Sequence, residues 1–429
     1  MAQVGGRRVL RVARTWMLVG LLLSYFGTTI VGGATPVLVS LSLLPLIWLP
    51  VMATLENLQD MCSAPVAKVL KRYDAGHILV FCELLDLILT VLAVLLIAVL
   101  GGASIIVVLC CYTVATSFLP LFIDLAEEFY GAEIEALDPG SAARFNTILY
   151  AAMPAVSQFA SGPLGSLLAG VSVLAVLFIN AVASACAIAA RYRSVSLGRR
   201  FTRMQSREAI VGDSETELPE EVEERSSSAP LRLRDLIQLR GAGSPIFSAA
   251  VPLATGLSGV YFAQWCASLV QNKGAFFAAA AVCVGVGALA GPVLARRLRS
   301  WVSAPTVLYV GSAATGALMV VAATAASSTV IGTNPTAIFV GFLSYATVAS
   351  FLMTGVNVTQ VTARQENYRG DLFVQVMSWG HSFAAAGGLA GIWAGLVLGA
   401  NRTPSPALIL GALILVLTII VLRPRSATC

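Results

Sequence analysis

The feature that most constrains this chain is a series of apolar segments, each about as long as a bilayer is thick. A helix needs about 20 mostly apolar residues to cross a membrane, and such segments recur along the 429 residues. Hydrophobic residues make up 57% of the sequence and charged residues only 11%, which is far from the balance of soluble domains. The composition predicts a polytopic membrane protein and excludes secreted, fibrous, disordered and nucleic-acid-binding classes.

The spans are expected to be helices and not the strands of a barrel. Barrel strands alternate apolar and polar residues, whereas stretches such as 87–100 are apolar on almost every face. At roughly 30 residues per pass, the length allows about twelve crossings. We therefore expect an all-α integral membrane protein with twelve transmembrane helices, the first at 14–40 and the last at 405–423.

The basic residues fall on alternate loops. Of the 27 Lys and Arg residues, 25 lie on one set of loops and on the tails, and only Lys273 and Arg402 lie on the other set. Because basic loops tend to stay on the cytoplasmic side, we expect both termini to be cytoplasmic. The compartment predicted is the cell's inner (plasma) membrane.

One long polar stretch, 191–243, divides the chain. It holds ten arginines and nine acids, which is the composition of a solvated linker. The predicted organisation is an N-terminal six-helix bundle at 1–190, a cytoplasmic linker at 191–243 and a C-terminal six-helix bundle at 244–429.

The two halves also repeat each other in sequence. Ala64-Pro65-Val66 precedes a basic cluster, as does Gly291-Pro292-Val293 at an offset of 227 residues. The Gly162-Pro163 element matches Gly387-Gly388 at an offset of 225 residues. Two repeated six-helix halves are the architecture of many secondary transporters, so we expect two pseudo-symmetric bundles.

Several of these motifs resemble the major facilitator superfamily, over nearly the whole chain. Residues 70–80 look like the family's signature between its second and third spans, in the style of bacterial siderophore and macrolide exporters. Lys71 stands where that signature has its Asp, and Ala75 stands where a basic residue is usual. Residues 364–370 look like the start of the family's eleventh span, and Gly162-Pro163 is similar to the Gly-Pro motif of antiporter members. The resemblance implies the major facilitator fold and export.

The same resemblance and the loop charges indicate residues that move with transport. We expect Gly162 and Pro163 to bend their helix, since Pro cannot complete the helical hydrogen bonds. A cytoplasmic gate is expected from five charged residues: Arg72, Asp74, Arg144, Arg299 and Arg369.

Acidic residues inside the predicted spans are the strongest chemical signal, because a charge in the bilayer costs on the order of a few kcal/mol. Glu56, Gln59 and Asp60 fall on one face of the second span, and Glu83 and Asp86 on one face of the third. No Lys or Arg falls within the cores of the predicted spans, so we expect these four acids to lack an embedded cation and to couple transport to protons. The alternative is that they bond to neighbouring helices or pair with loop arginines.

Neutral polar residues on helical spacing predict a substrate cavity. The candidates are Gln59, Gln264, Asn357 and Gln360. Hydrogen bonds between helices are an equally ordinary use of such side chains in membranes.

Other chemistry is missing from the sequence. The two histidines lie far apart, no Cys or His spacing suggests a metal site, and no phosphate-binding loop is present. We predict a protein that is not an enzyme, has no metal and no cofactor, and takes its energy from a gradient.

The sequence therefore predicts a secondary active transporter that exports a small organic molecule in a proton-coupled cycle of alternating access. The substrate class suggested by the resemblance is a siderophore, antibiotic or other metabolite. The expected partners are this substrate, protons and the lipid bilayer, with no nucleic acid, and the chain is expected to be monomeric. A proton-coupled importer and a non-transporting receptor or scaffold of the same fold remain alternatives.

Overall fold

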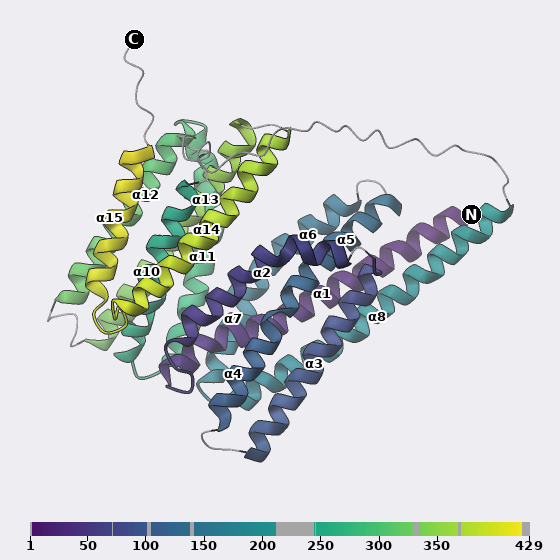
Figure 1. Cartoon of the computed structure of the whole chain (residues 1–429), viewed down its shortest axis with the longest axis horizontal. Coiled ribbons are helices and arrows are strands. Elements are labelled where there is room, and N and C mark those ends of the chain that lie inside the picture. Colours follow the sequence, from purple (N-terminus) through teal and green to yellow (C-terminus); the bar gives the residue numbers. More distant parts are fainter. Residues whose placement is uncertain are drawn as a thin grey trace, which may run out of the picture. The chain divides into compact units, whose positions relative to one another are not determined.

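A computed structural model describes residues 2–70, 72–100, 104–137, 141–211, 244, 246–328, 334–367 and 370–422. Throughout these ranges the regular structure is helical, with no strand (Figure 1). Apolar segments fold in this way because a backbone in lipid must satisfy its own hydrogen bonds. The all-α class expected from the sequence is confirmed.

The first half of the chain forms helices that run from the N-terminus to the polar stretch. They are α1 (Ala2–Ser40), α2 (Trp48–Leu70), α3 (Ala75–Leu100), α4 (Ser104–Ser117), α5 (Leu119–Leu137), α6 (Ser141–Val156), the π-helical turn η1 (Ser157–Ser161), α7 (Gly162–Ala169) and α8 (Val173–Val211). Because α8 runs to Val211, residues 191–211 of the predicted linker continue a helix.

The second half forms a similar series. Its described helices are α10 (Phe247–Ser268), α11 (Lys273–Arg299), α12 (Ala304–Ser327), α13 (Pro335–Asn367), α14 (Gly370–Val397) and α15 (Pro404–Leu422).

The chain divides into two compact units. The first comprises Met1–Ala34 and Gln59–Arg225, and the second comprises Thr35–Leu58 and Ser226–Cys429. The end of α1 and the start of α2 therefore belong to the second unit. The domain boundaries predicted from the sequence stay a prediction.

Eight described helical stretches are long and apolar enough to cross a membrane, one of them made by α4 and α5 together. These stretches are Val9–Ser40, Ala75–Leu100, Ile105–Glu127, Val173–Gly198, Lys273–Arg299, Ala304–Ser327, Pro335–Arg364 and Pro404–Val421. They make the chain a multi-pass membrane protein. The count of twelve spans stays a prediction.

Close helix contacts repeat between the two units. In the first unit, a side chain at Gly33 of α1 would collide with the backbone of Gly162, and one at Gly165 with Ile30 O. In the second unit, a side chain at Gly256 of α10 would collide with the backbone of Gly388 in α14. A side chain at Gly391 would collide with Leu253 O. Small residues let membrane helices approach this closely. The α1–α7 contact and the α10–α14 contact are therefore built in the same way.

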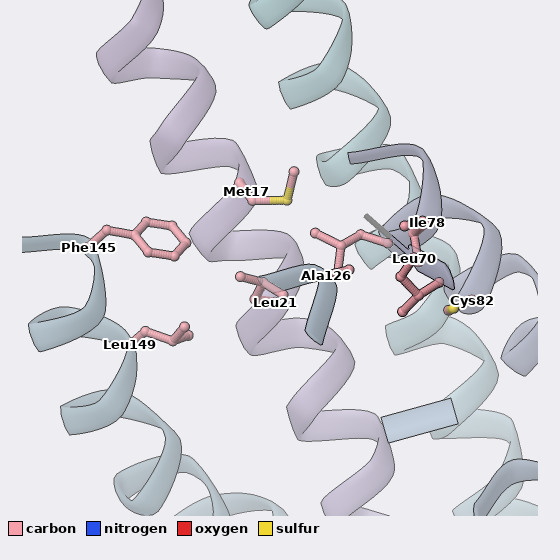
Figure 2. Close-up of a cluster of buried hydrophobic side chains, with 9 residues drawn as sticks. Met17, Leu21, Leu70, Ile78, Cys82, Ala126, Phe145 and Leu149 are labelled. Atoms are coloured by element: carbon pink, nitrogen blue, oxygen red, sulfur yellow. The ribbon is translucent and has the colours of Figure 1, made fainter. Parts of the chain in front are cut away.

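The apolar core of the first unit surrounds α1. Figure 2 shows Met17 and Leu21 of α1 in one cluster with Phe145 and Leu149 of α6, and Ile78 of α3 belongs to the same cluster. A smaller cluster in the second unit joins α10, α12 and α13 through Phe247, Leu308 and Val356. These contacts hold in place the helices that carry buried polar groups.

Candidate functional site

Helix α3 carries a polar stripe that faces the interior of the first unit. Glu83, Asp86 and Thr90 are 1%, 5% and 0% exposed, and their spacing of three and four residues puts them on one face. The opposite face of α3 presents apolar side chains such as Phe81 and Ile88 outward. The helix therefore hides its charges from lipid and shows lipid its hydrocarbon surface.

Glu83 has a buried cationic partner. Nη1 of Arg191 in α8 lies 3.1 Å from Glu83 Oε2 and also donates a hydrogen bond of 2.7 Å to Leu79 O. The Arg191 side chain is fully buried, and its Nε and Nη2 have no hydrogen-bond partner in the part of the chain that the structure describes. The expectation that the embedded acids lack a cation is thus wrong for Glu83.

Arg191 is the first residue of the predicted linker, because it begins an arginine-rich stretch. In the structure α8 continues past this residue, so its side chain still faces the helix bundle. Gly20 of α1 makes the room, since a Cβ there would lie only 2.6 Å from Arg191 Cγ. The sequence does contain a signal for this pair, because Arg191 directly follows an apolar run and another predicted span contains an acid.

Asp86 bonds to neutral donors. Its Oδ2 accepts hydrogen bonds from the hydroxyl of Ser184 at 2.8 Å and from the side-chain amide of Asn180 at 3.3 Å, both on α8. The same amide lies 3.0 Å from Thr90 Oγ1 and 3.0 Å from the hydroxyl of Tyr112 on α4. The bonds around Asn180 thus tie α3, α4 and α8 together.

We name this group the α3 polar cluster. Its members are Glu83, Asp86, Thr90, Tyr112, Asn180, Ser184 and Arg191. Sequence reasoning found the two acids and missed Asn180, Ser184 and Arg191. Asn180 and Ser184 are four residues apart, a spacing that places them on one face of α8.

Of the two acids predicted in the second span, the structure describes the side chain of one. Glu56 of α2 is exposed. The side chains of Gln59 and Asp60 lie outside the described residues. Their roles in proton coupling and substrate binding stay predictions.

Two of the amides predicted to line a substrate cavity make contacts inside the second unit. Gln264 of α10 donates to Pro36 O at 3.0 Å. Gln360 of α13 donates to Ser244 O and to the hydroxyl of Ser248, at 3.2 Å each. Asn357, one turn before Gln360, is exposed.

The side chains of three of the five residues predicted for a cytoplasmic gate are described, and they lie near the ends of helices. Asp74 precedes α3 and accepts a hydrogen bond of 2.9 Å from the backbone N–H of His77, so it caps that helix. Arg72 is exposed, and Arg299 lies in the last turn of α11. The side chain of Arg144 and the whole of Arg369 lie outside the described residues, and gating by the five stays a prediction.

The backbone changes its geometry just before Gly162 and Pro163. Residues Ser157–Ser161 form a π-helical turn, closed by a hydrogen bond from the N–H of Gly162 to Ser157 O. Pro163 follows at the start of α7, where its missing N–H is tolerated. Such π turns often mark functional positions in helices, and bending here stays a prediction.

Among the described residues there is no group of three or more His, Cys, Asp or Glu side chains that would hold a metal ion. The α3 polar cluster combines two carboxylates with a guanidinium, an amide and hydroxyls. This set is suited to holding and moving a proton or to fixing helices against one another.

No protein-family model matches the sequence, and no curated protein is significantly similar to it. Solved structures match over nearly the whole length. A bacterial metal transporter is 15% identical, with 96% of this chain and 99% of that chain covered and a TM-score of 0.59. A bacterial homologue of the iron transporter ferroportin in its inward-facing state is 17% identical, with 97% and 99% covered and a TM-score of 0.58.

The nucleoside transporter NupG is a third match, 10% identical, with 96% of this chain and 97% of that chain covered and a TM-score of 0.57. At such low identities these matches describe the fold and not the substrate. The all-α membrane class predicted from the sequence is therefore confirmed, and the chain shares its fold with these solved transporters.

Proposed function

We propose that this chain is a secondary transporter that exports a small organic molecule in exchange for protons by alternating access. The observation that carries the proposal is the pair of acids buried on α3, Glu83 and Asp86. An ionisable residue inside a membrane is costly and is therefore usually functional. The fold supports the same conclusion, because the solved proteins that share it include metal and nucleoside transporters.

The two acids are proposed to have different roles. Glu83 faces the fixed charge of Arg191, so it acts as the counterion of a buried arginine. Asp86 is bonded to an amide and a hydroxyl. The hydroxyl of Ser184 donates to an ionised carboxylate and accepts from a protonated one. We therefore assign the exchangeable proton to Asp86.

The bonds around Asp86 also supply a route from protonation to helix movement. Asn180 links Asp86 to Thr90 and to Tyr112. A change in the charge of Asp86 alters the strength of the bonds that hold α3 to α8, and through Tyr112 those to α4. In alternating access, such a change favours one packing of the helices over another.

The test is proton movement in proteoliposomes that carry the purified chain and a pH-sensitive dye inside. An imposed pH gradient is combined with hydrophobic and metal-chelating metabolites, and with nucleosides and metal ions because related folds transport them. The wild type is expected to move protons only with its substrate. Asp86→Asn, which keeps the shape and removes the charge, is expected to abolish proton movement and retain exchange of substrate for substrate.

Glu56→Gln and Asp60→Asn are the matched acid substitutions on α2. Proton movement that survives in Asp86→Asn and disappears in either α2 variant would place coupling on α2. A folded wild type that moves none of the compounds would contradict transport and favour the receptor or scaffold alternative. Inward movement of substrate together with protons would identify an importer.

A further inference from the structure

The second unit carries an apolar groove that is open at its surface. The groove lies between α11, α12 and α13 and has a volume of about 310 Å³. Its wall on α11 is the stripe of Gly291, Leu294, Ala295 and Leu298, and its lining is apolar except for Thr306. Val310 of α12 borders it and is 62% exposed. A groove of this kind in a membrane protein fits a hydrocarbon chain.

The floor of the groove is formed by glycines, which have no side chain to fill the space. A Cβ at Gly291 would collide with Phe351 O on α13, so α11 and α13 touch through their backbones. Gly311 and Gly355 also line the groove. These small residues leave the space that larger side chains occupy elsewhere between the helices.

One end of the groove meets a cluster of basic residues. Leu298 lines the groove and stands between Arg297 and Arg299 in the last turn of α11, which also contains Arg296. We name these three residues the arginine cluster. Trp301 follows and is 83% exposed. Trp is enriched where a membrane meets water, and this end lies on the side predicted to be cytoplasmic.

The sequence on both sides of the arginine cluster contains no acidic residue over a long stretch. Between Asp235 and Glu366 the chain contains no Asp or Glu. Helices α10, α11 and α12, and α13 up to residue 365, therefore offer the cluster no carboxylate. The membrane itself supplies anions at this level, because its cytoplasmic leaflet carries anionic lipids.

We propose that this groove and the arginine cluster together form a binding site for an anionic phospholipid. One acyl chain lies in the groove, and the phosphate-containing headgroup lies against the arginine cluster beside Trp301. Clusters of Lys and Arg at a membrane surface attract such headgroups. The site lies within the second unit and does not depend on the transport cycle proposed above.

The experiment is native mass spectrometry of the purified full chain in mild detergent. The chain is incubated with equal amounts of phosphatidylglycerol and phosphatidylcholine that have the same acyl chains. The wild type is expected to retain the anionic lipid at least about threefold more than the zwitterionic one. In the triple variant Arg296→Gln, Arg297→Gln, Arg299→Gln the two lipids are expected to be retained equally, whereas Arg402→Gln keeps the preference.

A second pair of variants tests the groove. Val310→Trp fills it from an exposed position and is expected to lower retention of both lipids. Val320→Trp is the control, because Val320 is 43% exposed on the same helix and does not line the groove. Three outcomes would each overturn the proposal. The wild type could retain the two lipids equally, the preference could survive in the triple variant, or the two Trp variants could retain lipid equally.

Discussion

Single residues decide whether charge is tolerated inside the first unit. Arg191 and Glu83 are both almost completely buried and lie 3.1 Å apart. Moving either charge out of water is expensive, and the presence of the other offsets much of the cost, together with the hydrogen bond from Arg191 to Leu79 O. The pair is therefore a strong constraint on how α3 and α8 pack.

This pairing predicts a large effect from removing one partner. Arg191→Met leaves Glu83 as an uncompensated buried charge and is expected to cost about 3–5 kcal/mol of stability, as is Glu83→Gln, which leaves Arg191 unpaired. The double variant is expected to lose less than the sum of the two, because no lone charge remains. The measurement is the free energy of unfolding of each purified variant in detergent.

Arg193→Met is the matched control for that series. Arg193 is exposed two residues further along α8, with its guanidinium 4.4 Å from the centre of the Trp16 ring. Losing this contact is expected to cost about 0.5–1 kcal/mol. If Arg191→Met were as mild as this control, or if the double variant lost the full sum, the buried pair would have no special role.

At the scale of elements, helix contacts in this protein rest on small residues. Ser166 of α7 donates a hydrogen bond of 2.8 Å to Gly33 O of α1, and Thr29 of α1 bonds to Ser161 of η1. Membrane helices lack a hydrophobic driving force for association, so close backbone approach and such hydrogen bonds supply it. The seam between α1 and α7 is therefore sensitive to a single methyl group.

Gly33→Ala is expected to destabilise the protein by about 1–3 kcal/mol, because overpacking forces backbone shifts. Its Cβ would lie 2.8 Å from Gly162 Cα, and a backbone atom cannot swing aside as a side chain can. Gly32→Ala is the control, since no atom lies within 4 Å of the Cβ built there. Thermal unfolding in detergent compares the two, and equal melting temperatures would show that this seam is loose.

At the scale of the whole molecule, the two units share one plan. Gly33 with Gly162 in the first unit corresponds to Gly256 with Gly388 in the second, and Gly165 with Ile30 corresponds to Gly391 with Leu253. The sequence comparison pairs Gly162 with Gly387, and the structure shifts this pairing by one residue. The duplication is thus visible in the contacts as well as in the sequence.

Because the glycine contact is repeated in the second unit, we expect the same substitution to have the same effect on stability there. Gly256→Ala is expected to destabilise the chain by about as much as Gly33→Ala, again about 1–3 kcal/mol, because its Cβ would lie 2.8 Å from Gly388 O. Gly259→Ala is its control, with no atom within 4 Å. The same unfolding assay applies, and a large loss in one unit without a loss in the other would contradict an equivalent role for the two seams.

Composition and segment length are enough to assign the class of the molecule. A chain with 57% hydrophobic residues in bilayer-length segments has no alternative to membrane helices, because only helices satisfy the backbone within each segment. The acidic stripe of α3 was also readable, since helical spacing fixes which residues share a face. The sequence repeat predicted two related halves. It paired Gly162 with Gly387, whereas the contacts show that Gly388 is the equivalent residue.

Which polar groups meet depends on how the helices pack against one another. The partner of Glu83 is Arg191, 108 residues later, and the donors to Asp86 come from the same distant helix. Local sequence rules describe one helix at a time, whereas a buried ion pair depends on which two helices pack and in what register. That register is set by contacts such as Gly20 against Arg191, where the absence of one side chain makes room for another.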